Sequence, residues 1–206
     1  MEVNNADVED DRELLQLMIA GEEQGFTALY RKYQAPVYRF ALQVCGVRHI
    51  AEEAMQETFL SLIRAPANYR SDRGPLLLYL FGIARRLVWK SARRDSVYSP
   101  LEDDRDLPVS SPAFVEDFAQ RDQARRLHHA ILSLPRKYRE VIVLCSLEEL
   151  SYEQAAAVVG SAIGTVRSRM HRAKQLLLRK LRERGSGAAV NNDLFLSCPR
   201  GLDYDL

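Results

Sequence analysis

Residues 150–177 read LSYEQAAAVVGSAIGTVRSRMHRAKQLL, and this stretch decides the fold of the C-terminal part of the chain. Ser151 followed three residues later by Gln154 is a capping-box signature, which predicts that a helix begins at Tyr152. Gly160 supplies the left-handed residue that commonly ends a helix, and helical periodicity resumes after the residues GSAI. The stretch therefore predicts two helices joined by a short turn.

The second of these helices has an apolar side and a polar side. Its apolar residues recur at helical spacing and predict a buried stripe made of Val166, Met170, Ala173 and Leu177. The other side and its flanks carry the candidate DNA contacts, which are Thr165, Arg167, Ser168, His171, Arg172 and Lys174. Arg can hold guanine edges in a major groove, and groups near a helix start can hold a phosphate. Taken alone, so short a basic run is more often a solvated surface.

Charge is segregated along the chain, although the formal net charge is only +1. Residues 1–30 hold eight acids and one Arg, and residues 95–123 hold eight acids and two Arg. Residues 64–94 and residues 161–184 each hold eight Lys or Arg and a single acid. Two basic segments separated by an acidic one predict two contacts on one polyanion, because phosphate neutralisation drives non-specific nucleic-acid binding.

Helical periodicity dominates the chain, and no run of alternating apolar and polar residues indicates a strand. The predicted fold class is all-α, with two small helical domains, a flexible acidic linker between them, and a helix-turn-helix in the second domain. The predicted helices are 12–20, 25–45, 50–64, 75–94, 123–133, 136–144, 152–159 and 163–181. Pro36 predicts a kink or a junction in the second helix, and Ile63 is expected on the buried side of the third.

The domain organisation follows from these helices and from the segments between them. Residues 10–94 form the predicted first domain, and residues 121–184 form the second. Residues 95–120 combine three prolines with serines and acids, a composition that is typical of a linker. Residues 185–206 form a tail to which the sequence assigns no role.

Composition narrows the function classes. Apolar residues make up 47% and charged residues 28%, as in ordinary globular proteins. The acidic start and the lack of an apolar run near about 18 residues predict a cytoplasmic protein without membrane insertion. Cys45, Cys145 and Cys198 form no CxxC pair, and the chain offers no Gly-rich phosphate loop, ligand-spaced His set or catalytic carboxylate pair. We therefore expect no enzyme activity, no metal site and no cofactor.

Several segments resemble the extracytoplasmic-function sigma factors of bacterial RNA polymerase. Within residues 134–177, LPRKYREVIVL, LSYEQAAAVVG and GTVRSRMHRAKQLL resemble their C-terminal domain, which binds the promoter element near −35. AEEAMQETFLSLIRA, residues 51–65, resembles the helix that docks on the polymerase clamp, and LLLYLFGIARRLVWKSARR, residues 76–94, resembles the helix that opens and reads the −10 element. The order and spacing of these blocks favour DNA recognition over a merely solvated face.

The resemblance implies roles for individual residues. It implies contact with the polymerase for Glu53, Gln56 and Glu57. It implies contact with the −10 element for Tyr69, Tyr79, Arg85, Arg86, Lys90, Arg93 and Arg94. It implies reading of the −35 element for Arg167, Ser168, His171 and Arg172. The implied partners are bacterial core RNA polymerase, promoter DNA and an anti-sigma factor.

The chain departs from the family pattern at several of these positions. Arg86 stands where Asn is common, Tyr79 stands where Trp is common, and Lys90 stands where an acid is usual. Ala162 replaces the usual Ser or Pro near the start of the last predicted helix, with Ser161 as the alternative cap. The first three departures bear on which −10 base the protein prefers.

Two other function classes account for less of this sequence. A stand-alone helix-turn-helix regulator accounts for the second domain, but it leaves the acidic face and the basic, aromatic-bearing helix of the first domain without a role. A nuclease or another enzyme lacks the expected catalytic groups. We therefore predict a sigma factor that binds core polymerase and directs promoter-specific initiation through the −35 and −10 elements.

Overall fold

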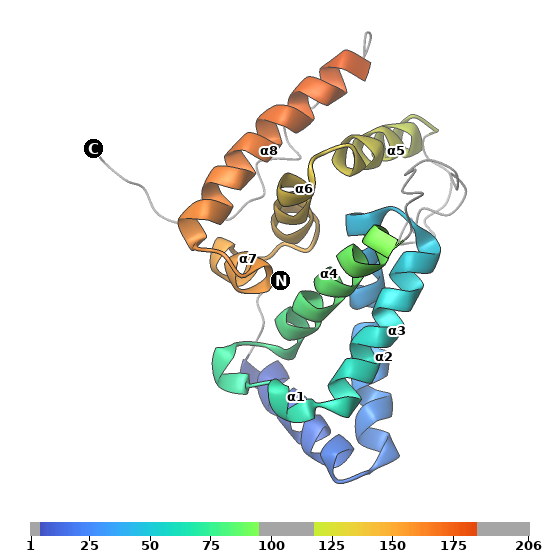
Figure 1. Ribbon diagram of the computed structural model, residues 1–206, viewed down its shortest axis with the longest axis vertical. Coiled ribbons are helices and arrows are strands. Elements are labelled where there is room, and N and C mark those ends of the chain that lie inside the picture. Colours follow the sequence, from blue (N-terminus) through green and yellow to red (C-terminus); the bar gives the residue numbers. More distant parts are fainter. Residues whose placement is uncertain (1–4, 95–117, 185–206) are drawn as a thin grey trace. The chain divides into compact units, whose positions relative to one another are not determined.

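The computed structural model describes residues 5–94 and 118–184, which are helical and contain no strand (Figure 1). The chain divides into two compact units, Met1–Ser110 and Ser111–Leu206, which confirms the predicted all-α class with two helical parts. The predicted tail and most of the predicted linker lie outside the described residues. The last three linker residues, 118–120, instead begin a helix, because neither Pro nor Gly occurs between Pro112 and the end of that helix at Leu132.

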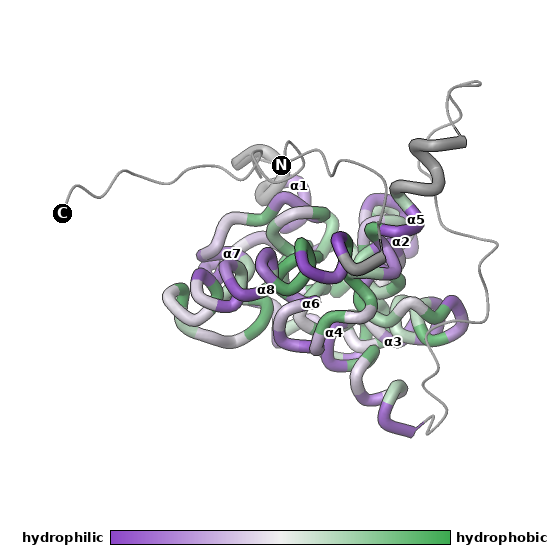
Figure 2. The backbone as a smooth tube through the Cα atoms, turned by 90° about the horizontal axis from the view of Figure 1, so that it is seen from above, coloured by the Kyte–Doolittle hydropathy of each residue, from purple (hydrophilic) through white to green (hydrophobic). Residues whose placement is uncertain are grey.

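Four long helices build the first unit. They are α1 (Asn5–Ile19), α2 (Glu23–Cys45), α3 (Arg48–Arg64) and α4 (Leu76–Arg94). Helix α2 packs against α1, α3 and α4, and α3 also packs against α4. Figure 2 shows apolar and polar residues interspersed along these helices, and the apolar residues that are buried form the core of the unit. At the centre, the fully buried rings of Phe40 and Phe81 stack with centroids 4.5 Å apart.

Two positions explain the course of α2. Pro36 lies inside one uninterrupted helix, so the predicted junction is absent. The burial of Tyr33, Val37 and Phe40 on either side of Pro36 offsets the roughly 3 kcal/mol that an interior proline costs a helix. At Gly25, any Cβ would lie 2.6 Å from the Leu14 carbonyl oxygen, so only glycine lets the backbones of α1 and α2 approach this closely.

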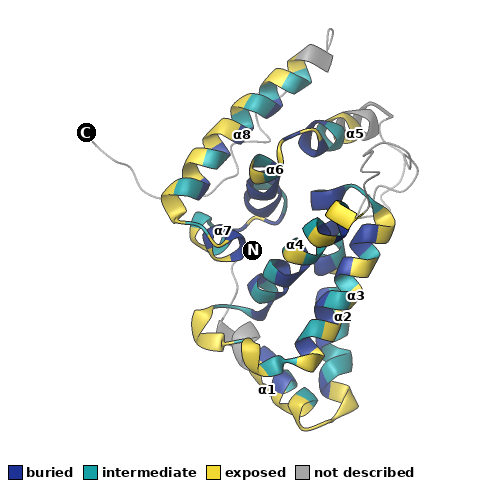
Figure 3. Ribbon diagram, in the orientation of Figure 1, coloured by how far each residue is buried: buried dark blue, intermediate teal, exposed yellow. Residues whose placement is uncertain are grey.

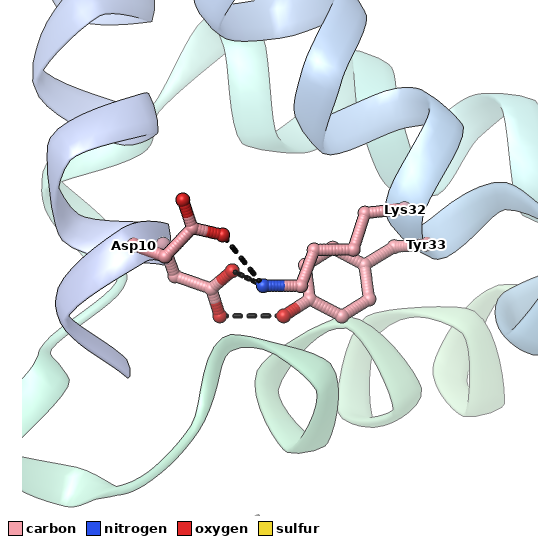
Figure 4. Close-up of polar contacts among 4 residues, drawn as sticks. Asp10, Lys32 and Tyr33 are labelled. Atoms are coloured by element: carbon pink, nitrogen blue, oxygen red, sulfur yellow. Dashed lines mark hydrogen bonds and ion pairs between the residues drawn. The ribbon is translucent and has the colours of Figure 1, made fainter. Parts of the chain in front are cut away.

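A buried carboxylate joins α1 to α2 (Figure 4). Asp11 is 2% exposed and accepts hydrogen bonds from the Tyr33 hydroxyl at 2.5 Å and from Lys32 Nζ at 2.9 Å. Lys32 Nζ also pairs with Asp10 at 3.0 Å, and these two carboxylates raise its pKa against the opposing effect of burial. Because a buried charge must be paired to be tolerated, this cluster fixes the position of α1 on α2.

The second unit contains the predicted helix-turn-helix. Its helices are α5 (Phe118–Leu132), α6 (Arg136–Ile142), α7 (Tyr152–Val159) and α8 (Ile163–Arg184). Helix α6 continues as one π-helical turn, Val143–Leu147, where an α-helix was expected up to residue 144. Helix α8 packs against α5, α6 and α7. One side of α8 therefore lies against these three helices.

The start and the end of α7 have the predicted local structure. The Ser151 hydroxyl accepts a hydrogen bond from the Gln154 backbone N–H at 3.2 Å, and the Gln154 side chain accepts from the Ser151 N–H at 2.9 Å. Gly160 is left-handed, with φ 66°, and its N–H donates to the Ala156 carbonyl. Both helix-boundary predictions are therefore confirmed.

Replacing the cap should destabilise the second unit by a measurable amount. We expect Ser151→Ala to lower its free energy of unfolding by about 1 kcal/mol, because the Gln154 N–H loses its acceptor. Denaturant unfolding followed by far-UV circular dichroism measures this change. Ser151→Thr keeps an acceptor and is the matched control; an alanine variant as stable as the threonine variant would contradict the capping assignment.

Candidate nucleic-acid interface

Helix α8 separates its buried and exposed residues as the sequence predicts (Figure 3). The predicted apolar stripe is buried: Val166, Met170, Ala173 and Leu177 are at most 1% exposed. The candidate contacts Arg167, Ser168, His171 and Arg172 are exposed, whereas Thr165 and Lys174 are half-buried on the flanks. The helix therefore presents a polar, basic face to solvent over the first three turns, where a groove-reading helix carries its base contacts.

Arg167 is held in place by residues of α7. Its guanidinium lies over the ring of Tyr152, 6.0 Å from the ring centroid, which is a cation–π contact. The pKa of the nearby Glu153 carboxyl is lowered by its own backbone N–H and by the Ser151 hydroxyl, and Arg167 lowers it further. The Tyr152 ring therefore restricts the directions that the Arg167 side chain can take.

Ser168 and Arg169 of α8 also form hydrogen bonds within the same motif. The Ser168 hydroxyl donates to the Thr165 carbonyl at 3.0 Å, which leaves the hydroxyl oxygen facing solvent as an acceptor. Arg169 donates to the Ser161 hydroxyl at 3.4 Å and so ties α8 back to the turn before it. Arg169 is half-buried and bonded to this turn, whereas Arg167 and Arg172 are exposed.

A second basic face lies on α4. Arg86, Lys90, Arg93 and Arg94 are exposed, whereas Arg85 is half-buried. All five lie after Gly82 in the helix, and two of them, Arg93 and Arg94, lie in its last turn. The exposed cations cluster toward the C-terminal end of α4, where the helix dipole also favours positive charge.

The aromatic pair predicted beside this face is brought together by the loop between α3 and α4. The rings of Tyr69 and Tyr79 lie 5.5 Å apart at an angle of 53°. The Tyr69 hydroxyl donates to the Gly74 carbonyl at 3.1 Å, which anchors the ring to the loop. Burial raises the pKa of Tyr69, and the negative charge of Asp11 raises it further. Burial also raises the pKa of Tyr79, partly offset by Arg86.

The third predicted set lies on α3. Glu53 and Gln56 are exposed, and Glu57 is half-buried. Glu57 forms an ion pair with Arg64 at 3.6 Å. Glu53 accepts from Arg94 at 2.9 Å, so a residue predicted to contact polymerase meets one predicted to contact DNA. The structure thus joins two predicted sets that lie 41 residues apart in the sequence.

Two apolar residues on α3 were missed as candidate contacts. Leu60 is 39% exposed and Ile63 is 44% exposed, so the prediction that Ile63 is buried is wrong. They follow Glu53 by seven and ten residues, which places all three on one helix face. That spacing was the available signal, but periodicity alone assigns an apolar residue to the core. We name Glu53, Gln56, Glu57, Leu60 and Ile63 the α3 face.

A buried arginine in the second unit has a structural role. Arg139 is 6% exposed and donates to the backbone carbonyls of Leu132 and Leu134 at the turn between α5 and α6.

Within the described residues, no group of three or more His, Cys, Asp or Glu side chains is placed to hold a metal ion. Across the same residues, no helix is both long enough and apolar enough to cross a bilayer.

Comparisons with known proteins agree with this geometry. Residues 29–97 match the family model "Sigma-70 region 2", and residues 124–177 match "Sigma-70, region 4". The chain is 35% identical over 164 residues to the ECF RNA polymerase sigma factor SigE of Mycolicibacterium smegmatis, covering 78% of this chain and 63% of that protein. It is 38% identical over 133 residues to SigD of Mycobacterium bovis, covering 62% of this chain and 61% of that protein.

A solved structure has the same fold. The sigma factor RpoE from Bartonella quintana, in complex with the anti-sigma factor NepR, matches with a TM-score of 0.61 at 24% identity, covering 76% of this chain and 96% of that one. The chain spans a little under two thirds of the length of the relatives SigE and SigD. With region 2 on the first unit and region 4 on the second, the chain belongs to the sigma-70 family and, within it, to the extracytoplasmic-function sigma factors.

Proposed function

We propose that this protein binds bacterial core RNA polymerase and directs promoter-specific transcription initiation by recognising a −35 and a −10 element. The observation that carries the proposal is the presence of one basic helical face in each unit, together with the acidic and apolar α3 face in the first. The predicted domains 10–94 and 121–184 would carry the −10 and −35 functions. The sigma factor family is not a catalytic family, and we propose that the chain has no enzymatic activity of its own.

For the −35 element, α8 would lie in the major groove. Arg167 and Arg172 are exposed and offer guanidinium donors, which suit guanine edges or phosphates. Ser168 and His171 lie between them on the same face, while Thr165 and Lys174 flank it. The contact of Arg167 with Tyr152 supports this role, because it restricts the arginine before DNA arrives.

For the −10 element, the loop and α4 would act together. Tyr69 and Tyr79 offer adjacent rings on which an unpaired base can stack, a contact worth about 1–3 kcal/mol per base. Arg85, Arg86, Lys90, Arg93 and Arg94 supply the positive charge that holds a displaced strand. Melted DNA is therefore the substrate that suits this mixture of aromatic and basic side chains.

The α3 face would dock on the polymerase. Glu53, Gln56 and Glu57 provide its polar part, and the exposed side chains of Leu60 and Ile63 provide apolar area to bury. An apolar centre with a charged rim is the usual anatomy of a protein interface. Because RpoE was solved in complex with an anti-sigma factor, we also propose a regulator of that kind for this chain. We further propose that the protein is located in the cytoplasm.

Run-off transcription tests the proposal directly. Purified bacterial core polymerase is combined with a promoter library, with and without this protein. We expect transcripts that start at defined sites sharing paired elements near −35 and −10. If the polymerase stays inactive and the protein does not co-elute with it, the proposal fails. In that case a stand-alone helix-turn-helix regulator, which dimerises and protects a palindromic site by itself, becomes the better account.

Removing one arginine should relax recognition at one position. We expect Arg172→Ala to cost about 1–3 kcal/mol at one −35 base, because a bidentate arginine contact is lost. Transcription from promoters substituted at each −35 position measures the change in preference. Arg179→Ala, an exposed residue two turns further along α8, is the control. An unchanged base preference in the Arg172 variant would remove that residue from the reading set.

A further inference from the structure

We propose that Gln175 is a positioning residue that fixes both the direction of Arg172 and the tautomer of His171 in the reading face. This proposal rests on the proposed −35 function. The three side chains are exposed on α8 and are joined by one amide. Arg172 donates to Gln175 Oε1 at 3.2 Å, and Gln175 Nε2 lies 2.9 Å from His171 Nε2. Their spacings, i to i+3 and i to i+4, are the ones that face each other on a helix.

The guanidinium determines the orientation of the amide. Arg172 has only donors, so the atom that faces it must be the carbonyl oxygen of Gln175. The amide nitrogen of Gln175 must then face His171. Because that nitrogen is also only a donor, Nε2 of the neutral imidazole has to accept, and its proton must sit on Nδ1. A charged arginine thus selects the tautomer of a histidine through one glutamine.

The selected tautomer determines what His171 can bind. With Nε2 engaged, Nδ1–H is the ring group left to donate toward DNA. A donor there suits the acceptors of the major groove, which are guanine N7 and O6, adenine N7 and thymine O4, or a phosphate oxygen. It does not suit the amino groups of adenine or cytosine. Gln175 would therefore influence base choice although the proposal gives it no base contact of its own.

Two substitutions separate the two effects. Gln175→Ala removes both bonds, so Arg172 loses its brace and His171 returns to the Nε2–H tautomer, which is favoured in an unconstrained imidazole. Gln175→Glu offers two acceptor oxygens, so Arg172 keeps its partner, while His171 must donate from Nε2. Only the native glutamine combines a braced arginine with an Nδ1–H histidine.

Nitrogen NMR of the full-length protein tests the tautomer without any reference to transcription. Long-range proton–nitrogen correlation at a pH where imidazole is neutral distinguishes the two forms, and His171→Gln identifies the signal among the four histidines. We expect Nδ1–H in the native chain and Nε2–H in both Gln175 variants. A native chain in the Nε2–H form would overturn the proposal.

Transcription by the reconstituted polymerase tests the effect on Arg172. On promoters substituted at the position that Arg172 reads, we expect Gln175→Ala to weaken the base preference about fivefold, the equivalent of one net hydrogen bond. Gln175→Glu should keep that preference, and Arg179→Ala should leave it unchanged. Native preference in the alanine variant, or equal loss in the alanine and glutamate variants, would overturn the positioning of Arg172. If the native protein supports no transcription, the proposed function fails instead, whatever the NMR result.

Discussion

Reversing two charges on the α3 face, in the variant Glu53→Lys with Glu57→Lys, should lower the affinity for core polymerase by about a hundredfold or more. Each lost charged contact is worth about 1.5–3 kcal/mol, and the new lysines add repulsion to a partner surface that suits acids. The fold should persist, because the pairs of Glu53 with Arg94 and of Glu57 with Arg64 are exposed and each contributes at most about 1 kcal/mol. Co-elution with core polymerase at moderate salt measures the effect.

The control for this variant carries the same change of net charge elsewhere. Glu22 and Glu23 are exposed where α2 begins and are not part of the α3 face, so we expect the variant Glu22→Lys with Glu23→Lys to bind polymerase normally. The Glu53 reversal also removes the ion-pair partner of Arg94, which keeps its hydrogen bond to the Ser91 hydroxyl. If polymerase binding survives in the α3 variant, or falls equally in the control, the docking assignment is wrong.

Removing the central ring of the first unit should unfold that unit selectively. Phe40 is fully buried and stacks on Phe81, so we expect Phe40→Ala to lower the free energy of unfolding by about 3–5 kcal/mol. The only tryptophan of the chain, Trp89, lies on α4, so its fluorescence reports on the first unit alone. Denaturant unfolding followed by tryptophan fluorescence therefore measures the change.

Far-UV circular dichroism provides the contrast, because it reports on the helices of both units. In the Phe40 variant we expect an early transition that coincides with the fluorescence change and a later one that matches the native second unit. Leu60→Ala removes an exposed apolar side chain and should leave the fluorescence midpoint almost unchanged. A Phe40 variant with a native fluorescence midpoint would contradict the position of this ring at the centre of the core.

Local sequence patterns were sufficient for both ends of α7 and for the polar, basic side of α8. Ser151 with Gln154, and Gly160, predicted both ends of α7, and the spacing of Val166, Met170 and Ala173 predicted the buried side of α8. These features depend on contacts within a few residues, where backbone geometry and side-chain periodicity are enough. The resemblance to sigma factors depended on the order of such local segments, and the matches to regions 2 and 4 confirmed it.

Contacts between helices could not be predicted in this way. Periodicity assigned Ile63 to the core, yet only the packing of α3 against α2 and α4 decides which apolar residues stay exposed. The same packing carries α2 through Pro36 and pairs Glu53 with Arg94 across 41 residues.

The sequence by itself therefore determined the all-α class, both ends of α7, the buried and polar sides of α8 and the family of this protein. The tertiary structure decided which faces remain open and which charged groups meet, because burial and pairing depend on neighbours that are distant along the chain.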